Sequence, residues 1–211
     1  MIGGPAVNLA PLEVVRFVEA DCAVYGDGEA STLELVEQWR KAGAAVPTPN
    51  VVWNPERYSA ADAEAPREPT RIAHLSDLAF PRLYEWIDLK PYLKAGTPYP
   101  IQTKRGCMFS CSYCVYKRIE GDFYRQRDPE AVADEIAAAR RDAGLWRFEF
   151  TDSVFNHPAG HAEDVCRVIA RRKLGVSLNS TGVNPMHFNL DLLRLMESAG
   201  FEEYSFAPDS A

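Results

Sequence analysis

Three cysteines stand close together in the chain, at positions where their thiolates can share one cluster. Cys107, Cys111 and Cys114 have the spacing C-x3-C-x2-C and account for three of the five cysteines in the 211-residue sequence. Thiolates this close on a short loop can bind three irons of an iron–sulfur cube. The fourth iron then has no protein ligand, so a substrate or a cofactor can bind it.

Two other uses of clustered cysteines fit the sequence less well. Structural zinc sites usually have four ligands, and no Cys or His stands at short spacing to complete a set here. A disulfide framework is disfavoured by the odd number of cysteines and by the lack of a signal peptide. The sequence therefore favours an iron–sulfur site.

The loop Arg105–Cys114 (RGCMFSCSYC), with Tyr113 directly before the last cysteine, resembles the cluster-binding loop of the radical S-adenosylmethionine (SAM) enzymes. The resemblance implies a [4Fe–4S] cluster whose open iron is chelated by the amino and carboxylate groups of SAM. One electron from the cluster then cleaves SAM to a 5′-deoxyadenosyl radical, which abstracts a hydrogen from a substrate. It also implies a small-molecule substrate and an electron donor such as flavodoxin or ferredoxin.

The elements around this loop alternate between strands and helices, which predicts an α/β fold with a parallel sheet. Expected strands are 98–104, 146–151, 176–180 and 204–207, and expected helices are 115–119, 129–143, 162–173 and 190–199. Asp128 followed by Pro129 predicts the start of the second helix, and Gly144 predicts its end. The resemblance implies that these units are the first part of a (β/α) radical SAM barrel, with the chemistry at the carboxyl ends of the strands.

The resemblance also implies which residues contact SAM. Tyr113 would lie near the adenine, and the ends of the second, third and fourth strands would supply polar contacts. The matching residues are Asp152, Ser153, Asn179, Ser180 and Asp209. The chain departs from the family at the second strand end, where Thr151-Asp152-Ser153 replaces a G-G-E or D-D sequence. This departure puts the role of Ser153 in doubt.

Residues 1–42 resemble the second half of the Rossmann-like cobalamin-binding domain that precedes many radical SAM domains. The match rests on Gly3-Gly4-Pro5, on Tyr25–Glu29 and on a helix that a capping box, Ser31–Glu34, is expected to open. The family's D-x-H-x-x-G loop, whose histidine ligates cobalt, is absent from the sequence. We therefore expect a chain truncated at both ends, in which cobalamin binds only if the missing half is supplied.

The remaining divisions follow from proline content and charge. Residues 43–97 hold seven of the fifteen prolines and are expected to form a linker, which leaves 98–211 as the radical SAM domain. A net charge of −7 argues against a broad nucleic-acid-binding surface. The sequence has no run of about 18 apolar residues and no export signal, so we expect no membrane span and a cytoplasmic protein.

Outside the loop, Cys22 and Cys166 lie among apolar residues and are expected to be core thiols. His157 and His161 have the spacing of two ligands on a helix, but Pro158 and Gly160 intervene, which disfavours a metal site. Methyl transfer and ring formation are the reactions that the resemblance implies. The alternatives are an incomplete fragment that only binds a cluster, and a methylthiotransferase-like enzyme.

Overall fold

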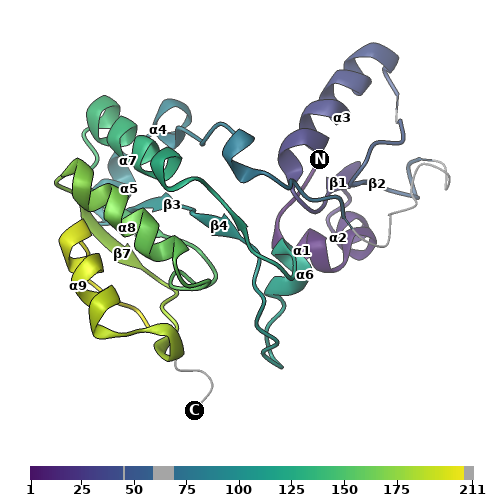
Figure 1. Ribbon diagram of the computed structural model, residues 1–211. Coiled ribbons are helices and arrows are strands. Elements are labelled where there is room, and N and C mark those ends of the chain that lie inside the picture. Colours follow the sequence, from purple (N-terminus) through teal and green to yellow (C-terminus); the bar gives the residue numbers. More distant parts are fainter. Residues whose placement is uncertain (45, 59–68, 207–211) are drawn as a thin grey trace. The chain divides into compact units, whose positions relative to one another are not determined.

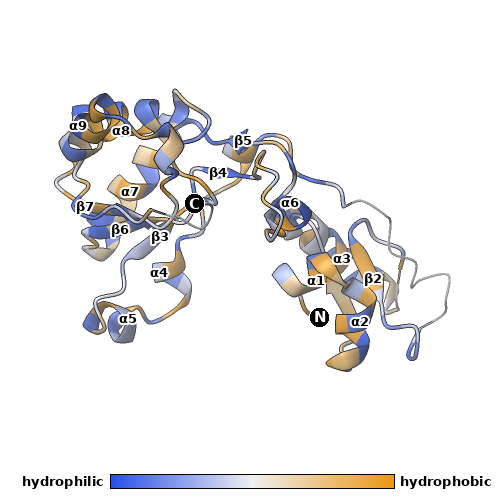
Figure 2. Cartoon of the chain, turned by 90° about the horizontal axis from the view of Figure 1, so that it is seen from below, coloured by the Kyte–Doolittle hydropathy of each residue, from blue (hydrophilic) through white to orange (hydrophobic). Residues whose placement is uncertain are grey.

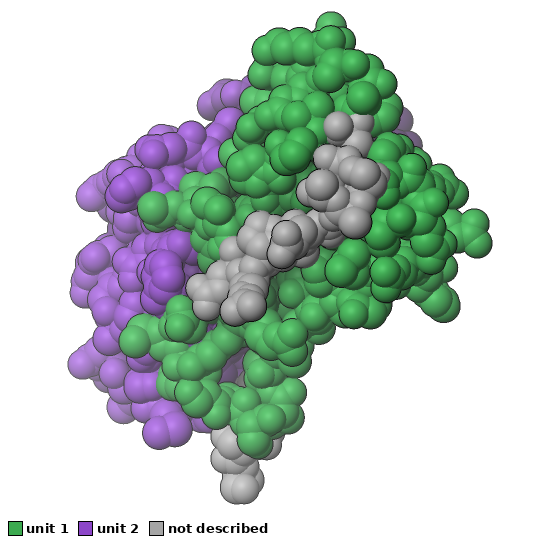
Figure 3. Space-filling model, turned by 90° about the vertical axis from the view of Figure 1, so that its right-hand side faces the viewer, with its two compact units in different colours: residues 1–73, 108–122 green, residues 74–107, 123–211 purple. Residues whose placement is uncertain are grey.

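The computed structural model describes residues 1–44, 46–58 and 69–206. The chain forms two compact units, which Figure 3 colours separately. Unit 1 comprises residues 1–73 and 108–122, and unit 2 comprises residues 74–107 and 123–211. None of the helices in these described ranges is long and apolar enough to cross a membrane.

Unit 2 is built on a parallel sheet in the order β3-β6-β7. Figure 1 labels the outer strands β3 and β7, and Figure 2 labels all three. The strands are β3 (Tyr99–Ile101), β6 (Arg147–Phe150) and β7 (Ser177–Ser180). Helices α7 (Pro129–Ala143), α8 (His161–Arg172) and α9 (Leu190–Ala199) follow the strands in turn, and α8 packs against both α7 and α9. The strand order follows the chain order, as it does in a barrel wound in one direction.

Local sequence signals set the ends of these helices. The Asp128 carboxylate accepts a hydrogen bond from the Glu130 backbone N–H (2.9 Å) at the start of α7, and Gly144 ends the helix in a left-handed conformation. Asn189 caps α9 in the same way by accepting from the Leu192 N–H (2.9 Å). Both helices begin and end as the sequence predicts.

The core of unit 2 lies between the sheet and the three long helices. Alternate strand residues point into it, and Phe150 stacks on Phe155 with ring centroids 4.9 Å apart. The largest fully buried members of this core are Ile101, Ile136, Leu145, Phe148, Phe150, Phe155, Ile169, Leu178 and Met196. Apolar residues from both layers therefore hold the strand ends in fixed positions.

Unit 1 is smaller. Its helices are α1 (Pro5–Leu9), α2 (Pro11–Phe17), α3 (Gly28–Ala42) and α6 (Tyr116–Glu120). Strand β1 (Cys22–Val24) pairs antiparallel with β2 (Val51–Trp53), and Ile2 makes a single parallel bridge to Ala23. The apolar sequence of β2 is visible in Figure 2.

One prediction for the first hundred residues is wrong. Helix α3 begins at Gly28 rather than at the expected capping box, and Ser31 is buried within it. The residue that precedes α3 is Asp27, whose carboxylate accepts a hydrogen bond from the Ile72 N–H (2.7 Å). Within the expected linker, residues 43–97, strand β2 is part of unit 1 and residues 74–97 belong to unit 2. As a statement about functional domains, the division at 42 and 97 stays a prediction.

Short connecting elements complete unit 2. They are η1 (Leu75–Asp77), α4 (Leu83–Trp86), α5 (Lys90–Lys94), η2 (Pro185–His187) and the antiparallel pair β4 (Lys104–Arg105) and β5 (Arg125–Gln126). The predicted fourth strand is not a regular strand within the described residues. Phe201 bridges Leu178 and Phe206 bridges Val183, both in parallel. Residues 207–211 lie outside the described part.

Candidate functional site

The carboxyl ends of β3, β6 and β7 lie at one edge of the parallel sheet. The loop that contains Cys107 follows β3 and β4, and Asp152 and Ser153 follow β6. Ser180 is the last residue of β7. The structure therefore brings several of the predicted site residues to the edge that the sequence indicates.

The three cysteines of the loop differ in exposure. All five cysteines of the chain are free thiols; Cys107 is 7% exposed, whereas Cys111 and Cys114 are exposed. Cys107 belongs to unit 2, and Cys111 and Cys114 belong to unit 1. No three Cys, His, Asp or Glu side chains in the described ranges gather closely enough to hold one metal ion. The donor chemistry, three free thiols within eight residues, fits an iron–sulfur cluster, and the ligand assignment stays a proposal.

The carboxylate of Asp152, a predicted SAM contact, is hydrogen-bonded to other residues of the protein. Its Oδ1 accepts hydrogen bonds from the backbone N–H groups of Thr103 (2.7 Å) and Lys104 (3.1 Å). Its Oδ2 accepts from the Thr103 hydroxyl (2.5 Å) and the Lys104 ammonium (3.2 Å). The side chains of Lys104 and Asp152 are 1% and 0% exposed. The structure thus gives Asp152 an internal role, which disfavours the predicted contact with the SAM amino group.

Lys104 was missed by sequence reasoning. Besides the ion pair with Asp152, its ammonium donates to the Phe155 carbonyl (2.8 Å) and lies 5.4 Å from the centre of that ring. The ion pair joins the first residue of β4 to Asp152, which lies two residues after the end of β6. A lysine within a strand normally indicates solvent exposure, so its position gave no signal of burial.

Ser153 connects the same two strand ends. Its hydroxyl donates to the carbonyl oxygen of Gly106 (2.9 Å), the residue directly before Cys107. Ser153 is half-buried, so its bond to the loop is protected from solvent only in part. This contact gives Ser153 a role in holding the cysteine loop, whether or not it also contacts SAM.

Ser180 and Asn179 lie on opposite faces of β7. Ser180 is buried on the core side and accepts a hydrogen bond from the Gly182 N–H (3.3 Å). Asn179 is in register with Glu149 on β6, and its amide donates to the Glu149 carboxylate (3.3 Å). Side chains alternate along a strand, so Asn179 and Glu149 both lie on the sheet face opposite the aromatic core. Glu149 was missed, although the alternation of Phe148 and Phe150 implies its direction.

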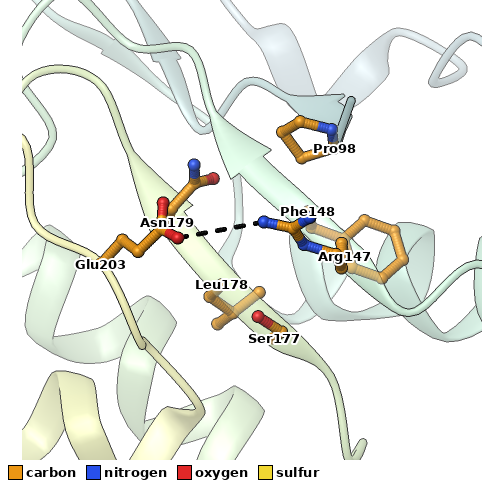
Figure 4. A pocket seen from close by; sticks show the side chains of 7 residues that line it. All are labelled: Pro98, Arg147, Phe148, Ser177, Leu178, Asn179 and Glu203. Carbon is orange, nitrogen blue, oxygen red and sulfur yellow. Dashed lines mark ion pairs between the residues drawn. The ribbon is translucent and has the colours of Figure 1, made fainter. Parts of the chain in front are cut away.

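Asn179 also lines a small hollow near the amino ends of the strands. Figure 4 shows its lining, in which Arg147 forms an ion pair with Glu203 (4.0 Å). The other residues around it are Pro98, Phe148, Ser177 and Leu178. The predicted set is completed by Tyr113, which is 61% exposed, and by Asp209, which lies outside the described residues.

Further residues at this edge were not expected. The hydroxyl of Tyr124 lies 4.0 Å from the sulfur of Cys107. Its ring packs on His157, with centroids 5.3 Å apart, and His157 packs on His187 at 4.5 Å. His161 is separate from this row, because it opens α8 and its Nε2 lies 2.9 Å from the Arg127 carbonyl. The two-residue strands that position Tyr124 are too short to be predicted from sequence.

Comparison with known proteins shows the family of this chain. The family model of the radical SAM superfamily matches residues 101–211, just over half of the chain. An uncharacterised methyltransferase of Pyrococcus horikoshii is 26% identical over all of this chain and 45% of its own length. Tryptophan 2-C-methyltransferase of Streptomyces laurentii is 34% identical over 41% of this chain and 14% of its own length. The chain thus spans less than half of the relatives it matches.

Solved structures agree on the fold. The radical SAM methyltransferase TsrM of Kitasatospora setae, solved with tryptophan and a SAM analogue, matches 99% of this chain and 41% of its own, at 25% identity and a TM-score of 0.81. The cobalamin-dependent SAM radical enzyme OxsB matches 98% of this chain at 14% identity and a TM-score of 0.74, which shows the fold alone. These likenesses confirm the predicted α/β fold and agree with the predicted cobalamin-linked class. The chain belongs to the radical SAM superfamily.

Proposed function

We propose that this chain carries the cluster and the SAM site of a radical SAM enzyme, with Cys107, Cys111 and Cys114 as the cluster ligands. The observation that carries the proposal is the C-x3-C-x2-C loop, which lies inside the region matched by the family model and follows the first strand of a parallel sheet. Thiolate ligands at three irons leave the fourth free for SAM.

When bound, the cluster supplies the electron that cleaves SAM to a 5′-deoxyadenosyl radical. The chain's own residues hold and orient the two groups. Ser153 and the Lys104–Asp152 ion pair fix the loop and the strand end beside it. Asn179 lies on the sheet face opposite the core and stays a predicted SAM contact, and we add its partner Glu149. Tyr113 and Asp209 stay predicted contacts.

Methyl transfer is the reaction that the relatives favour. Relatives named as methyltransferases include those of Pyrococcus horikoshii and Streptomyces laurentii, and a SAM analogue is bound in TsrM. Ring formation is the second candidate, because an anaerobic magnesium-protoporphyrin IX monomethyl ester cyclase of Synechocystis is 25% identical over 88% of this chain. We propose a small-molecule substrate, flavodoxin or ferredoxin as the electron donor, and a cytoplasmic enzyme.

The proposal also covers cobalamin binding by this chain. TsrM has been solved with cobalamin and a [4Fe–4S] cluster, and it resembles this chain over both units at 24% identity. The sequence of this chain has no D-x-H-x-x-G motif to supply a histidine to cobalt. We therefore propose that these 211 residues bind cobalamin weakly by themselves, which equilibrium dialysis against hydroxocobalamin measures. Sub-micromolar affinity would contradict this proposal.

The test of the function is reductive cleavage of SAM. The chain is reconstituted anaerobically with iron and sulfide, reduced with dithionite and assayed for 5′-deoxyadenosine. We expect product from the wild type and from a Cys22→Ala/Cys166→Ala control, and none when the three loop cysteines are replaced by Ala. A wild type that binds a cluster but never cleaves SAM would favour the alternative of a fragment that only binds a cluster.

A further inference from the structure

Strands β4 and β5 bring Tyr124 to the cysteine loop. In this antiparallel pair Lys104 lies opposite Gln126, and Arg105 lies opposite Arg125. Continued by one residue, the same register places Tyr124 opposite Gly106, next to Cys107. The short β4–β5 pair therefore brings the backbone of Tyr124 to the base of the loop.

The side chain of Tyr124 reaches the sulfur of Cys107. The distance from Oη to Sγ is 4.0 Å, at the long end of hydrogen bonds to sulfur. Cys107 is buried, whereas Cys111 and Cys114 are exposed. A hydroxyl beside the buried sulfur meets less competition from water than one beside an exposed sulfur.

Two histidines from neighbouring strand ends support the Tyr124 ring. His157 comes from the loop after β6, and His187 ends η2, which follows β7. The ring of His157 packs between those of Tyr124 (5.3 Å) and His187 (4.5 Å). This row of rings restricts the directions in which the hydroxyl can point.

We propose that the hydroxyl of Tyr124 donates a hydrogen bond to the Cys107 thiolate and raises the reduction potential of the cluster. This inference rests on the proposed function, because it requires Cys107 to be a cluster ligand. Hydrogen bonds to cluster sulfurs are one of the means by which proteins set cluster potentials. The donor stabilises negative charge on sulfur, and reduction adds negative charge, so the donor favours the reduced form. His157 acts as a positioning residue, because it acts through the tyrosine ring on which it packs.

The test compares Tyr124→Phe with the wild type after anaerobic reconstitution of the full chain. Phenylalanine keeps the ring contact with His157 and removes only the hydroxyl. We expect unchanged iron content and a midpoint potential more negative than that of the wild type, measured by a redox titration followed by electron paramagnetic resonance. Tyr84→Phe is the matched control, because within the described residues the Tyr84 hydroxyl has no hydrogen-bond partner. Its midpoint should equal that of the wild type.

The histidine variants separate positioning from packing. His157→Ala leaves the tyrosine ring less restricted, so we expect a shift in the same direction as Tyr124→Phe but smaller. His157→Phe retains a flat ring and should restore the wild-type potential. Resonance Raman spectra give a second readout, in which the loss of the hydrogen bond should raise the Fe–S stretching frequency of a cysteine ligand.

The outcomes distinguish this inference from the function on which it rests. If the wild type binds no cluster, the proposed function fails, and this inference fails with it. If the wild type binds a cluster and Tyr124→Phe has the same midpoint, only the role of Tyr124 is wrong. If Tyr124→Phe binds no iron while Tyr84→Phe does, the hydroxyl serves the structure of the loop and does not tune the potential.

Discussion

Replacing Asp152 by Asn should destabilise the protein strongly even without any ligand. The carboxylate accepts four hydrogen bonds from Thr103 and Lys104, and the ion-paired side chains are 1% and 0% exposed. Asparagine keeps one acceptor oxygen but presents an amide to the Lys104 ammonium, which is then a buried charge without a counter-ion. Breaking a buried ion pair on one side costs about 3–5 kcal/mol.

The loss is measured by urea unfolding of the apo-protein, followed by circular dichroism. With a denaturant dependence of about 1–3 kcal/mol per M, the unfolding midpoint should fall by roughly 2 M. Lys104→Met should lower the free energy of unfolding by less than Asp152→Asn does. The Asp152 carboxylate then still accepts hydrogen bonds from Thr103 and from the backbone N–H of residue 104. The double variant removes both charges and should be more stable than Asp152→Asn alone, which a double-mutant cycle expresses as a coupling energy.

Urea unfolding of the apo-protein also decides whether Asp152 is an internal anchor or a contact for SAM. Removing an internal anchor destabilises the ligand-free protein, whereas removing a residue whose role is to contact SAM does not. If Asp152→Asn and Lys104→Met each cost less than about 1 kcal/mol and their effects add, then the ion pair does not hold the strand ends together. The predicted contact between Asp152 and the SAM amino group would then be the better account.

Three further predictions concern other parts of unit 2. Burial raises the pKa of Glu135 above its ordinary value of 4.5 despite the opposing effect of Arg127. As the pH rises from 4.5 through the raised pKa, the free energy of unfolding of the wild type should therefore fall relative to that of Glu135→Gln. A difference between the two proteins that does not change with pH would refute this. Burial raises the pKa of Cys166 to about 12, so this thiol should react with Ellman's reagent at pH 8 only after unfolding. Asn189→Ala removes the cap on the Leu192 N–H and should cost about 1 kcal/mol in urea unfolding, whereas an unchanged midpoint would contradict the capping role.

Much of unit 2 could be predicted because its signals are local. The start of α7 depends on Asp128 and Pro129 within one turn, and the direction of β6 depends on alternation within four residues. The cysteine loop is equally local, since its spacing is legible without any tertiary contact. These features require only neighbours in the sequence.

Sequence patterns do not show where a side chain is bonded to a distant part of the chain. Asp27 interacts with Ile72, 45 residues away, and α3 begins where the capping box did not place it. Asp152 stands where a ligand contact was expected, but it bonds to Lys104, 48 residues away. Single-sequence patterns do not show such pairings. The prediction of a fourth strand was wrong for a related reason. Isolated bridges are too short to produce an alternation of apolar and polar residues in the sequence.

The central claim is that the loop cysteines bind a [4Fe–4S] cluster, and the most direct measurement is iron and sulfide content after anaerobic reconstitution. The wild type should contain about four irons per chain, with the broad visible absorption of a thiolate-bound cluster. A Cys22→Ala/Cys166→Ala variant, which removes the two buried thiols outside the loop, should load equally. The Cys107→Ala/Cys111→Ala/Cys114→Ala variant should load none. Full iron loading in that triple variant would contradict the account.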